Sequence, residues 1–190
     1  MLPPSAVFLV GFMGAGKTSV GCALGQRLNW LFEDLDDRIE RAGGRTVAEI
    51  FRDSGEKAFR LAERAALMEV FEELNAGSVR IVALGGGAFV QPENAALLRG
   101  ANVATVFLDA PVDELWQRCS EQMREKGASR PLLQSAKQFR DLHRARRKDY
   151  LRASLKIETG GRAIDAIADE IVVKLKLNKI AVRLEEGEAE

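Results

Sequence analysis

The chain has 190 residues, which suits one domain with a substantial buried core. Its 28 basic and 28 acidic residues balance, so overall charge favours neither nucleic acid nor a membrane surface as a partner. Since no apolar run approaches about 18 residues and no signal peptide is apparent, we expect a cytoplasmic protein without a transmembrane helix. Cys22 and Cys119 are too far apart for a metal or redox motif and are expected to be ordinary helix residues. The single histidine, His143, is expected to be a solvated helix residue.

The first predicted element is a buried strand of a parallel sheet, formed by the apolar run at residues 7–10. Residues 11–18 follow directly and read G-F-M-G-A-G-K-T, which fits the phosphate-cradling pattern G-x-x-x-x-G-K-[ST]. Glycine allows the backbone to wrap closely around a phosphate, because positive φ angles carry no Cβ penalty there. The alternative, a glycine-rich turn that binds nothing, is disfavoured because strand, spacing, Lys17 and Thr18 are all in place.

A helix is predicted after this motif, because apolar residues recur at helical spacing at positions 20, 23, 24 and 28. Its first N–H groups and its dipole would attract a phosphate. We expect Lys17 to reach the β and γ phosphates of a nucleoside triphosphate and Thr18 to ligate Mg²⁺. The nucleotide-binding residues are expected to be consecutive: Gly14, Ala15, Gly16, Lys17, Thr18 and Ser19.

Further along the chain, short apolar strands alternate with amphipathic helices, which predicts an α/β fold with a parallel sheet covered on both faces. Four more strands are expected, at residues 31–33, 79–84, 103–108 and 155–158. Helices are expected around residues 47–51, 59–74, 112–124 and 164–175, with a further arginine-rich helix around residues 144–147.

Two carboxylates, Asp34 and Asp36, follow the second strand and are expected at the same crevice as the phosphate-binding loop. They suggest separate tasks, one near Mg²⁺ and one near an acceptor hydroxyl. The alternative is a helix N-cap, for which aspartate is well suited and which Asp37 is also placed to supply.

Two segments interrupt the alternation of strands and helices. Gly85, Gly86 and Gly87 end the third strand and either permit close backbone approach to a ligand or form a flexible connector. Residues 125–138 are polar and include Arg130 before Pro131, which disfavours helical backbone at Arg130. We expect a mobile basic loop here, of the kind that closes over a phosphate site.

Arginines indicate the second substrate. Arg60 next to Phe59 suits a pocket for a small organic anion, because guanidinium binds carboxylate in a bidentate fork. Arg144, Arg146 and Arg147 cluster in a later helix, and for Arg144 and Arg147 we favour a solvated face. These features indicate a small-molecule kinase without naming its substrate.

Taken in order, the motifs resemble those of the shikimate kinase family, over roughly residues 5–175. By this resemblance Asp34 supports Mg²⁺, and Asp36 holds the shikimate hydroxyls. The stretch that contains Asp53, Gly55 and Glu56 and ends in F-R-x-x-E looks like the family's shikimate-binding segment. The resemblance implies the following roles in that segment: Arg60 binds the substrate carboxylate, Glu63 orients Arg60, and Phe51 and Phe59 wall the pocket.

The later motifs extend the resemblance. Residues 85–87 look like the family's triple-glycine turn at the same pocket, and R-P-L-L beginning at Arg130 matches the lid motif whose arginine reaches the transferring phosphate. Arg146, four residues before Tyr150, aligns with the second carboxylate-binding arginine. Arg118 is the best candidate for the arginine that packs on adenine. Lys17, Asp36 and Arg130 would be the catalytic residues.

The resemblance implies a P-loop NTPase fold of three layers, with a central five-stranded parallel sheet, helices on both faces and a mobile lid. It implies transfer of the γ-phosphoryl group of ATP to the 3-hydroxyl of shikimate, with Mg²⁺, by a protein expected to be a monomer. One kinase domain is expected over residues 1–177, with the lid at about 119–137. Eleven residues separate Arg118 from Arg130, more than in compact family members. The acidic residues 178–190 lie outside the resemblance and are expected to be a disordered tail.

Two other kinds of protein share part of this pattern. Gluconate kinases and nucleoside monophosphate kinases also have a P-loop and a lid, so motif order rather than fold separates them from shikimate kinases. A nucleotide-binding regulator without catalysis would be expected to lack Lys17, Asp36 or Arg130, and all three are present.

Overall fold

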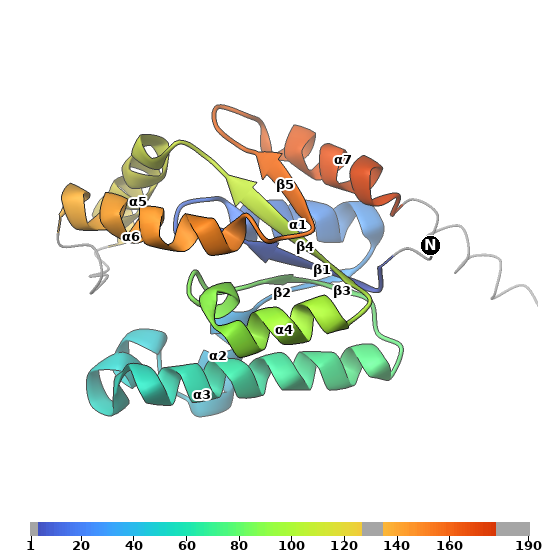
Figure 1. Ribbon diagram of the computed structural model, residues 1–190, viewed down its shortest axis with the longest axis horizontal. Helices are drawn as coiled ribbons and strands as arrows, with labels where there is room; N and C mark the ends of the chain where they lie inside the picture. Colours follow the sequence, from blue (N-terminus) through green and yellow to red (C-terminus); the bar gives the residue numbers. More distant parts are fainter. Residues whose placement is uncertain (1–3, 127–134, 178–190) are drawn as a thin grey trace, which may run out of the picture.

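The structure is a computed structural model that describes residues 4–126 and 135–177. It contains a parallel five-stranded sheet in the order β2-β3-β1-β4-β5 (Figure 1). The strands are β1 (Ala6–Val10), β2 (Leu31–Asp34), β3 (Arg80–Ala83), β4 (Val103–Asp109) and β5 (Leu155–Glu158). Each lies within one residue of its predicted ends. All five residues of β1 are buried, as expected for the central strand of a sheet covered on both faces.

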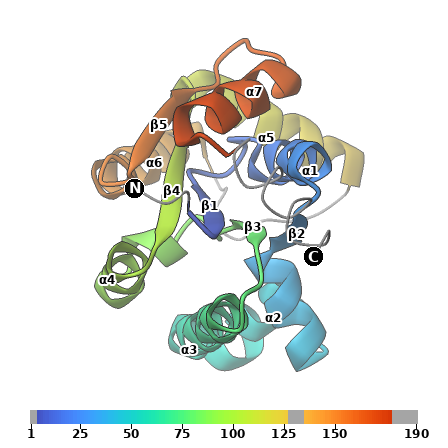
Figure 2. The same ribbon diagram turned by 90° about the vertical axis from the view of Figure 1, so that its right-hand side faces the viewer.

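Helices cover both faces of the sheet. The helical elements are α1 (Lys17–Leu28), α2 (Leu35–Gly43), α3 (Val47–Asn75), η1 (Ala88–Val90), α4 (Pro92–Gly100), α5 (Val112–Lys126), α6 (Ala136–Tyr150) and α7 (Ile164–Leu175). The end-on view in Figure 2 shows α1 and α7 on one face and α3 and α4 on the other. The predicted three-layer α/β fold is therefore confirmed.

The two helices expected at residues 47–51 and 59–74 form one element, α3, with a break at Gly55 (φ 78°, ψ 173°). The start of α3 is fixed by a capping box: the Glu49 N–H donates to Thr46 Oγ1 at 3.2 Å, and the Thr46 N–H donates to Glu49 Oε2 at 2.8 Å. Helix α4 and the 3₁₀ turn η1 were not predicted. Pro92 at the first position of α4, followed by Glu93, is the signal that would have indicated that helix.

Both ends of the region expected to be a loop, residues 125–138, are helical. Helix α5 continues to Lys126, and α6 begins at Ala136 after Ser135, whose hydroxyl accepts from the Gln138 N–H at 3.2 Å. Arg130 and Pro131 lie outside the described residues, as does the predicted acidic tail. Within the described ranges, no helix has the length and apolar character needed to cross a membrane.

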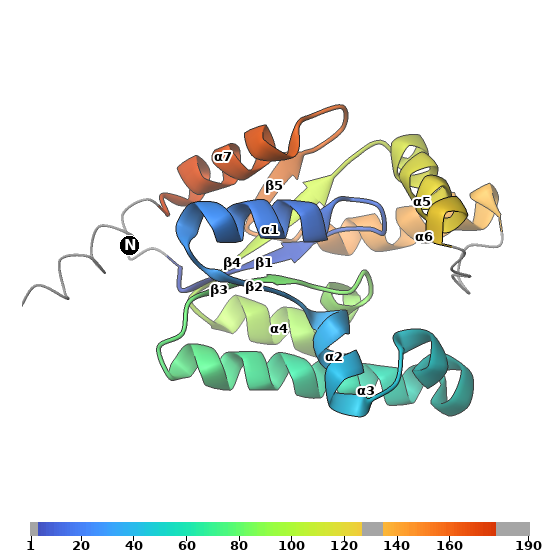
Figure 3. The same ribbon diagram turned by 180° about the vertical axis from the view of Figure 1, so that it is seen from behind.

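The strands all run in the same direction, so their carboxyl ends meet at one edge of the sheet. Figure 3 shows the turn after β1, the first part of α3 and helices α5 and α6 gathered at this edge. Ligands bind at this edge in open parallel sheets. The fold therefore places the predicted functional segments around one region.

Candidate active site

A pocket of about 580 Å³ lies at the carboxyl ends of β1, β2 and β3. It brings together almost every predicted site residue that the structure describes. These are Gly14, Ala15, Gly16, Lys17, Thr18, Ser19, Asp34, Asp36, Phe51, Phe59, Arg60, Glu63, Gly85, Gly86, Gly87 and Arg146. Arg118 is not among the described residues that line it, and Arg130 lies outside the described residues.

The phosphate-binding loop has the backbone conformation expected from its glycines. Gly14 (φ 80°) and Gly16 (φ 84°) have positive φ angles, and α1 begins directly after Gly16. No described side chain caps the start of α1, so its first N–H groups face the pocket as potential donors to an anion. The Lys17 ammonium donates to the carbonyls of Gly11 and Phe12, at 3.0 and 3.2 Å.

Arg118 lies on α5 against the outside of this loop. Its guanidinium donates to the Gly14 carbonyl at 3.3 Å and pairs with Glu114 one turn earlier on the same helix. The structure therefore places Arg118 next to the phosphate-binding loop, where it contacts the loop backbone.

Asp34 is the N-cap of α2 and also contacts the first turn of α1. Its carboxylate accepts the Asp36 N–H at 3.1 Å and so caps α2, while its other oxygen lies 3.3 Å from Thr18 Oγ1. Asp37 is therefore not the cap. Burial raises the pKa of Asp34, and the hydrogen bond from Asp36 opposes that shift. A hydroxyl and a carboxylate are the oxygen donors that suit Mg²⁺, which commonly takes one or two carboxylates together with substrate phosphates. The donor set at Thr18 and Asp34 therefore fits that ion.

Asp36 lies in the first turn of α2. Its Oδ1 atom is buried and has no hydrogen-bond partner among the described residues. Burial, together with the negative charge of Asp34, raises the pKa of Asp36 to about 6, although Lys17 opposes the shift. A buried carboxylate oxygen without a partner is unfavourable in a folded protein, which makes a ligand the expected partner.

Arg60 lies on the second part of α3, between two carboxylates. Its NH1 group donates to both oxygens of Glu63, at 2.9 and 3.1 Å, and its Nε and NH2 groups donate to Glu56 Oε1 at 3.3 and 3.0 Å. Glu63 is 0% exposed, and burial raises its pKa to about 7, although Arg60 opposes that shift. Phe59 and Phe51 pack with ring centroids 4.6 Å apart, and the Arg60 guanidinium lies 5.2 Å from the Phe59 ring centre. The pocket therefore has one aromatic wall next to a guanidinium group.

The three glycines after β3 form the floor of the pocket, and at two of them a larger residue would not fit. A Cβ atom at Gly87 would lie 2.5 Å from Arg60 NH2, and one at Gly85 would lie 2.7 Å from Asp36 Oδ1. At Gly86 a Cβ atom would make only ordinary contacts, the nearest at 3.5 Å. Glycine is needed here because charged side chains approach the backbone closely. These contacts favour a packing role for the segment over a merely flexible connector.

Helix α6 places Arg146 over the other side of the pocket, 6.0 Å from the Phe12 ring centre. Tyr150 is buried, and its hydroxyl donates to the Gly86 carbonyl, so it ties α6 to the glycine floor. Burial raises the pKa of Tyr150 to about 12. Sequence reasoning used Tyr150 only as a spacing marker and missed this contact.

Two expectations for α6 were wrong. Arg147 is only partly solvated: its side chain is 37% exposed and pairs with Asp109, a buried residue at the end of β4, at 2.5 Å. His143 is half-buried against the Phe12 ring, with ring centroids 5.3 Å apart, and burial lowers its pKa. Arg144 is exposed, as expected. A single acidic residue at the carboxyl end of a buried strand, Asp109, was the available signal that a cation would pack there.

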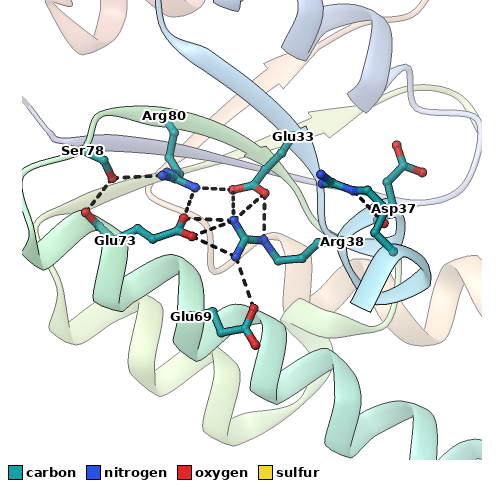
Figure 4. Close-up of polar contacts among 8 residues, drawn as sticks. Glu33, Asp37, Arg38, Glu69, Glu73, Ser78 and Arg80 are labelled. Carbon is teal, nitrogen blue, oxygen red and sulfur yellow. Dashed lines mark hydrogen bonds and ion pairs between the residues drawn. The ribbon is translucent and has the colours of Figure 1, made fainter. Parts of the chain in front are cut away.

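A network of charges connects β2 and β3 to α2 and α3, the helices that carry Asp36 and Arg60 (Figure 4). Arg38 of α2 donates to Glu33 of β2 at 2.9 Å and to Glu73 of α3 at 2.9 Å. Arg80 of β3 donates to Glu33 at 2.7 Å and also pairs with Glu73. Glu33 and Arg80 are buried, so losing either partner would leave an uncompensated charge in the interior. The network therefore fixes α2 and α3 relative to the sheet.

A parallel sheet with a phosphate-binding loop after its central strand, and an arginine- and carboxylate-lined pocket beside it, defines a kinase of the P-loop class. The family model described as shikimate kinase matches residues 13–176. The chain belongs to the shikimate kinase family.

Individual relatives agree with this assignment. A shikimate kinase from Cereibacter sphaeroides is 42% identical over 165 residues, which is 85% of this chain and 78% of that one. A shikimate kinase from Streptomyces avermitilis is 38% identical over 176 residues, or 91% of this chain and 96% of that one. Among solved structures, shikimate kinase from Acinetobacter baumannii in complex with shikimate is 37% identical and covers 94% of this chain and 96% of that one, with a TM-score of 0.79. A gluconokinase from Sinorhizobium meliloti, at 17% identity and a TM-score of 0.56, shares the fold alone.

Proposed function

We propose that this chain transfers the γ-phosphoryl group of ATP to the 3-hydroxyl of shikimate, giving shikimate 3-phosphate and ADP. The observation that carries the proposal is the buried Oδ1 atom of Asp36, which has no hydrogen-bond partner among the described residues and lies in the same pocket as the phosphate-binding loop and Arg60. An acceptor hydroxyl there would supply the missing hydrogen bond. Membership of the shikimate kinase family and the shikimate-bound relative support the choice of acceptor.

On the phosphate side, catalysis requires that negative charge on the transferring group be neutralised and held in line with the acceptor. The backbone N–H groups at the start of α1 would bind the phosphates, and Lys17 would move from its loop carbonyls to the β and γ phosphates. Thr18 and Asp34 would hold Mg²⁺, which supplies further positive charge to the phosphates when bound. By the family resemblance, Arg130 would contact the transferring phosphate and Arg118 the adenine.

On the acceptor side, Arg60 and Arg146 would bind the substrate carboxylate, and Phe51 and Phe59 would contact the ring. Glu63 would fix the orientation of Arg60 through its two hydrogen bonds. Asp36 would orient the 3-hydroxyl and accept its proton. Because its pKa is about 6, most molecules carry the ionised form of Asp36 at neutral pH.

Positioning supplies much of the proposed rate enhancement. Holding two reactants in a reactive geometry is worth about 7–11 kcal/mol of the barrier.

The proposal is tested by measuring ADP release with Mg-ATP alone and then with shikimate, gluconate or quinate added separately. We expect turnover with shikimate and little release without it. Release that does not depend on shikimate would contradict the proposed transfer. A preference for gluconate would leave the proposed role of the phosphate-binding loop unchanged, but it would overturn the assignment of shikimate as the acceptor.

A further inference from the structure

Two carboxylates hold different parts of the Arg60 guanidinium. Glu63 accepts both of its hydrogen bonds from NH1. Glu56 accepts from the Nε–NH2 edge of the guanidinium, where both groups donate to the same oxygen, Oε1. The Nε–NH2 edge is one of the pairs of parallel donors by which arginine binds a carboxylate in a fork. Glu56 therefore occupies one of the edges through which arginine can bind a carboxylate.

The two carboxylates differ in how firmly they are held. The Glu63 side chain is 0% exposed, so separating it from Arg60 would leave its charge unpaired in the protein interior. The Glu56 side chain is 66% exposed, so it can turn into water with little loss of solvation. Glu56 also follows Gly55, where the backbone leaves helical geometry, and so begins the second helical part of α3. Glu63 is thus a permanent partner of Arg60, whereas Glu56 can be exchanged.

Charge balance in the pocket favours an exchange over an addition. Asp36 lies close enough to Glu63 to disfavour its ionisation, so the pocket is already crowded with negative charge. A ligand carboxylate that joined Glu56 and Glu63 would be the third carboxylate around the Arg60 guanidinium. Replacing Glu56 leaves the charge around Arg60 unchanged.

We infer that Glu56 is a resident substitute for the substrate's carboxylate: it holds the Nε–NH2 edge of Arg60 in the free protein and is displaced when an acceptor carboxylate binds. The inference rests on the proposed role of Arg60 in binding that group. A neutral analogue of the acceptor has no charge to exchange for that of Glu56, so it would bind with Glu56 still paired to Arg60.

The test is calorimetric titration of shikimate into the full chain and its Glu56→Gln and Glu56→Ala variants at one ionic strength. Removing the competitor is expected to lower the Kd for shikimate by about twofold to fivefold, the range for an ion pair with an exposed partner. Glu72→Gln is the matched control, because it removes the same charge from an exposed position further along α3. We expect that variant to bind shikimate as the unmodified chain does.

The methyl ester of shikimate separates charge exchange from simple opening of the pocket. If Glu56 competes through charge, its removal tightens binding of the acid and leaves binding of the ester unchanged. Equal tightening of both ligands would mean that Glu56 blocks the pocket sterically and would overturn the inference. Unchanged or weaker binding of the acid would also overturn it, because Glu56 would then merely brace Arg60.

Arg60→Ala distinguishes this inference from the proposed function on which it rests. If that variant binds shikimate normally, the assignment of Arg60 is wrong, and the exchange fails with it. If Arg60→Ala weakens binding but neither Glu56 variant tightens it, the exchange alone is wrong.

Discussion

The two halves of the pocket are built in different ways. The phosphate-binding half is one continuous stretch, residues 11–19, that contributes backbone N–H groups and Lys17 from a turn between β1 and α1. The acceptor half draws on four separated segments, with Asp36 on α2, Arg60 on α3, Gly87 after β3 and Arg146 on α6. A local motif therefore defines the first half, and only the folded chain assembles the second.

The halves also differ in electrostatics. Burial raises the pKa of Asp36 to about 6 and that of Glu63 to about 7, and both residues belong to the acceptor half. Their burial is tolerated because the charge network of Arg38, Glu33 and Arg80 fixes the helices that carry them. The acceptor half thus holds a buried carboxylate oxygen, Asp36 Oδ1, that has no partner among the described residues and that a ligand hydroxyl would satisfy. This is the arrangement expected of a pocket selective for its acceptor.

The largest expected effect falls on the phosphate half. Lys17→Ala should lower kcat by on the order of a thousandfold, because preorganised charge at the transferring group contributes most in the transition state. Steady-state kinetics with saturating shikimate provide the measurement. A kcat within about threefold of the unmodified enzyme would remove Lys17 from the catalytic residues.

Asp36→Asn tests the residue of the acceptor half that is proposed to accept the proton of the substrate hydroxyl. We expect phosphoryl transfer to fall by about a hundredfold to a thousandfold, because the amide cannot accept the proton of the hydroxyl. Binding of ATP, measured by titration without shikimate, should remain near normal. Robust transfer by this variant would leave Asp36 with a structural role only.

Arg60→Ala should have a smaller effect that is confined to one substrate. Loss of a charge-assisted contact of roughly 1.5–3 kcal/mol corresponds to a decrease of about ten- to a hundredfold in kcat/KM for shikimate. The KM for ATP should hardly change. If both substrates are affected equally, Arg60 does not belong to the acceptor half alone.

Two neighbouring glycines offer a sharper comparison within the floor of the pocket. A Cβ atom at Gly87 would lie 2.5 Å from Arg60 NH2, so Gly87→Ala should displace that guanidinium and raise the KM for shikimate by about tenfold. Gly86→Ala adds the same methyl group where the nearest contact is 3.5 Å, and it should raise the KM much less. Equal effects from the two variants would show that backbone flexibility, not the position of Arg60, limits binding.

The smallest effect is on stability and depends on pH. The folded-state pKa of Asp36 is about 6, above its ordinary value of 3.8, so ionisation of Asp36 destabilises the free protein as pH rises through this window. Asp36→Asn should therefore raise the free energy of unfolding at pH 8 by on the order of 1–3 kcal/mol. The gain should shrink as pH falls from 6 toward 4, because Asp36 becomes protonated in the folded protein. Urea unfolding at pH 5 and pH 8 measures this, and an equal gain at both values would contradict an electrostatic cause.

The sequence predicted most of the fold. Apolar runs bounded by glycine, proline or polar residues placed all five strands to within one residue, since burial on both faces of a parallel sheet requires such runs. It missed α4, whose apolar pattern is short, and it placed Arg147 and His143 in solvent. Periodicity reports which face of a helix is apolar, but not which buried charge or ring another element brings to it. Arg147 contacts Asp109, and His143 contacts Phe12, across large separations in the chain.

By itself the sequence determined the phosphate-binding loop, because its glycines, Lys17 and Thr18 are neighbours and their geometry follows from local backbone preferences. It also supplied the ordered motifs by which the family is identified. Only the tertiary structure decided that Gly87 must lack a side chain, that Tyr150 holds the Gly86 carbonyl, and that Glu56 shares Arg60 with Glu63. Those facts depend on distances between side chains on different elements, and packing of the elements sets those distances.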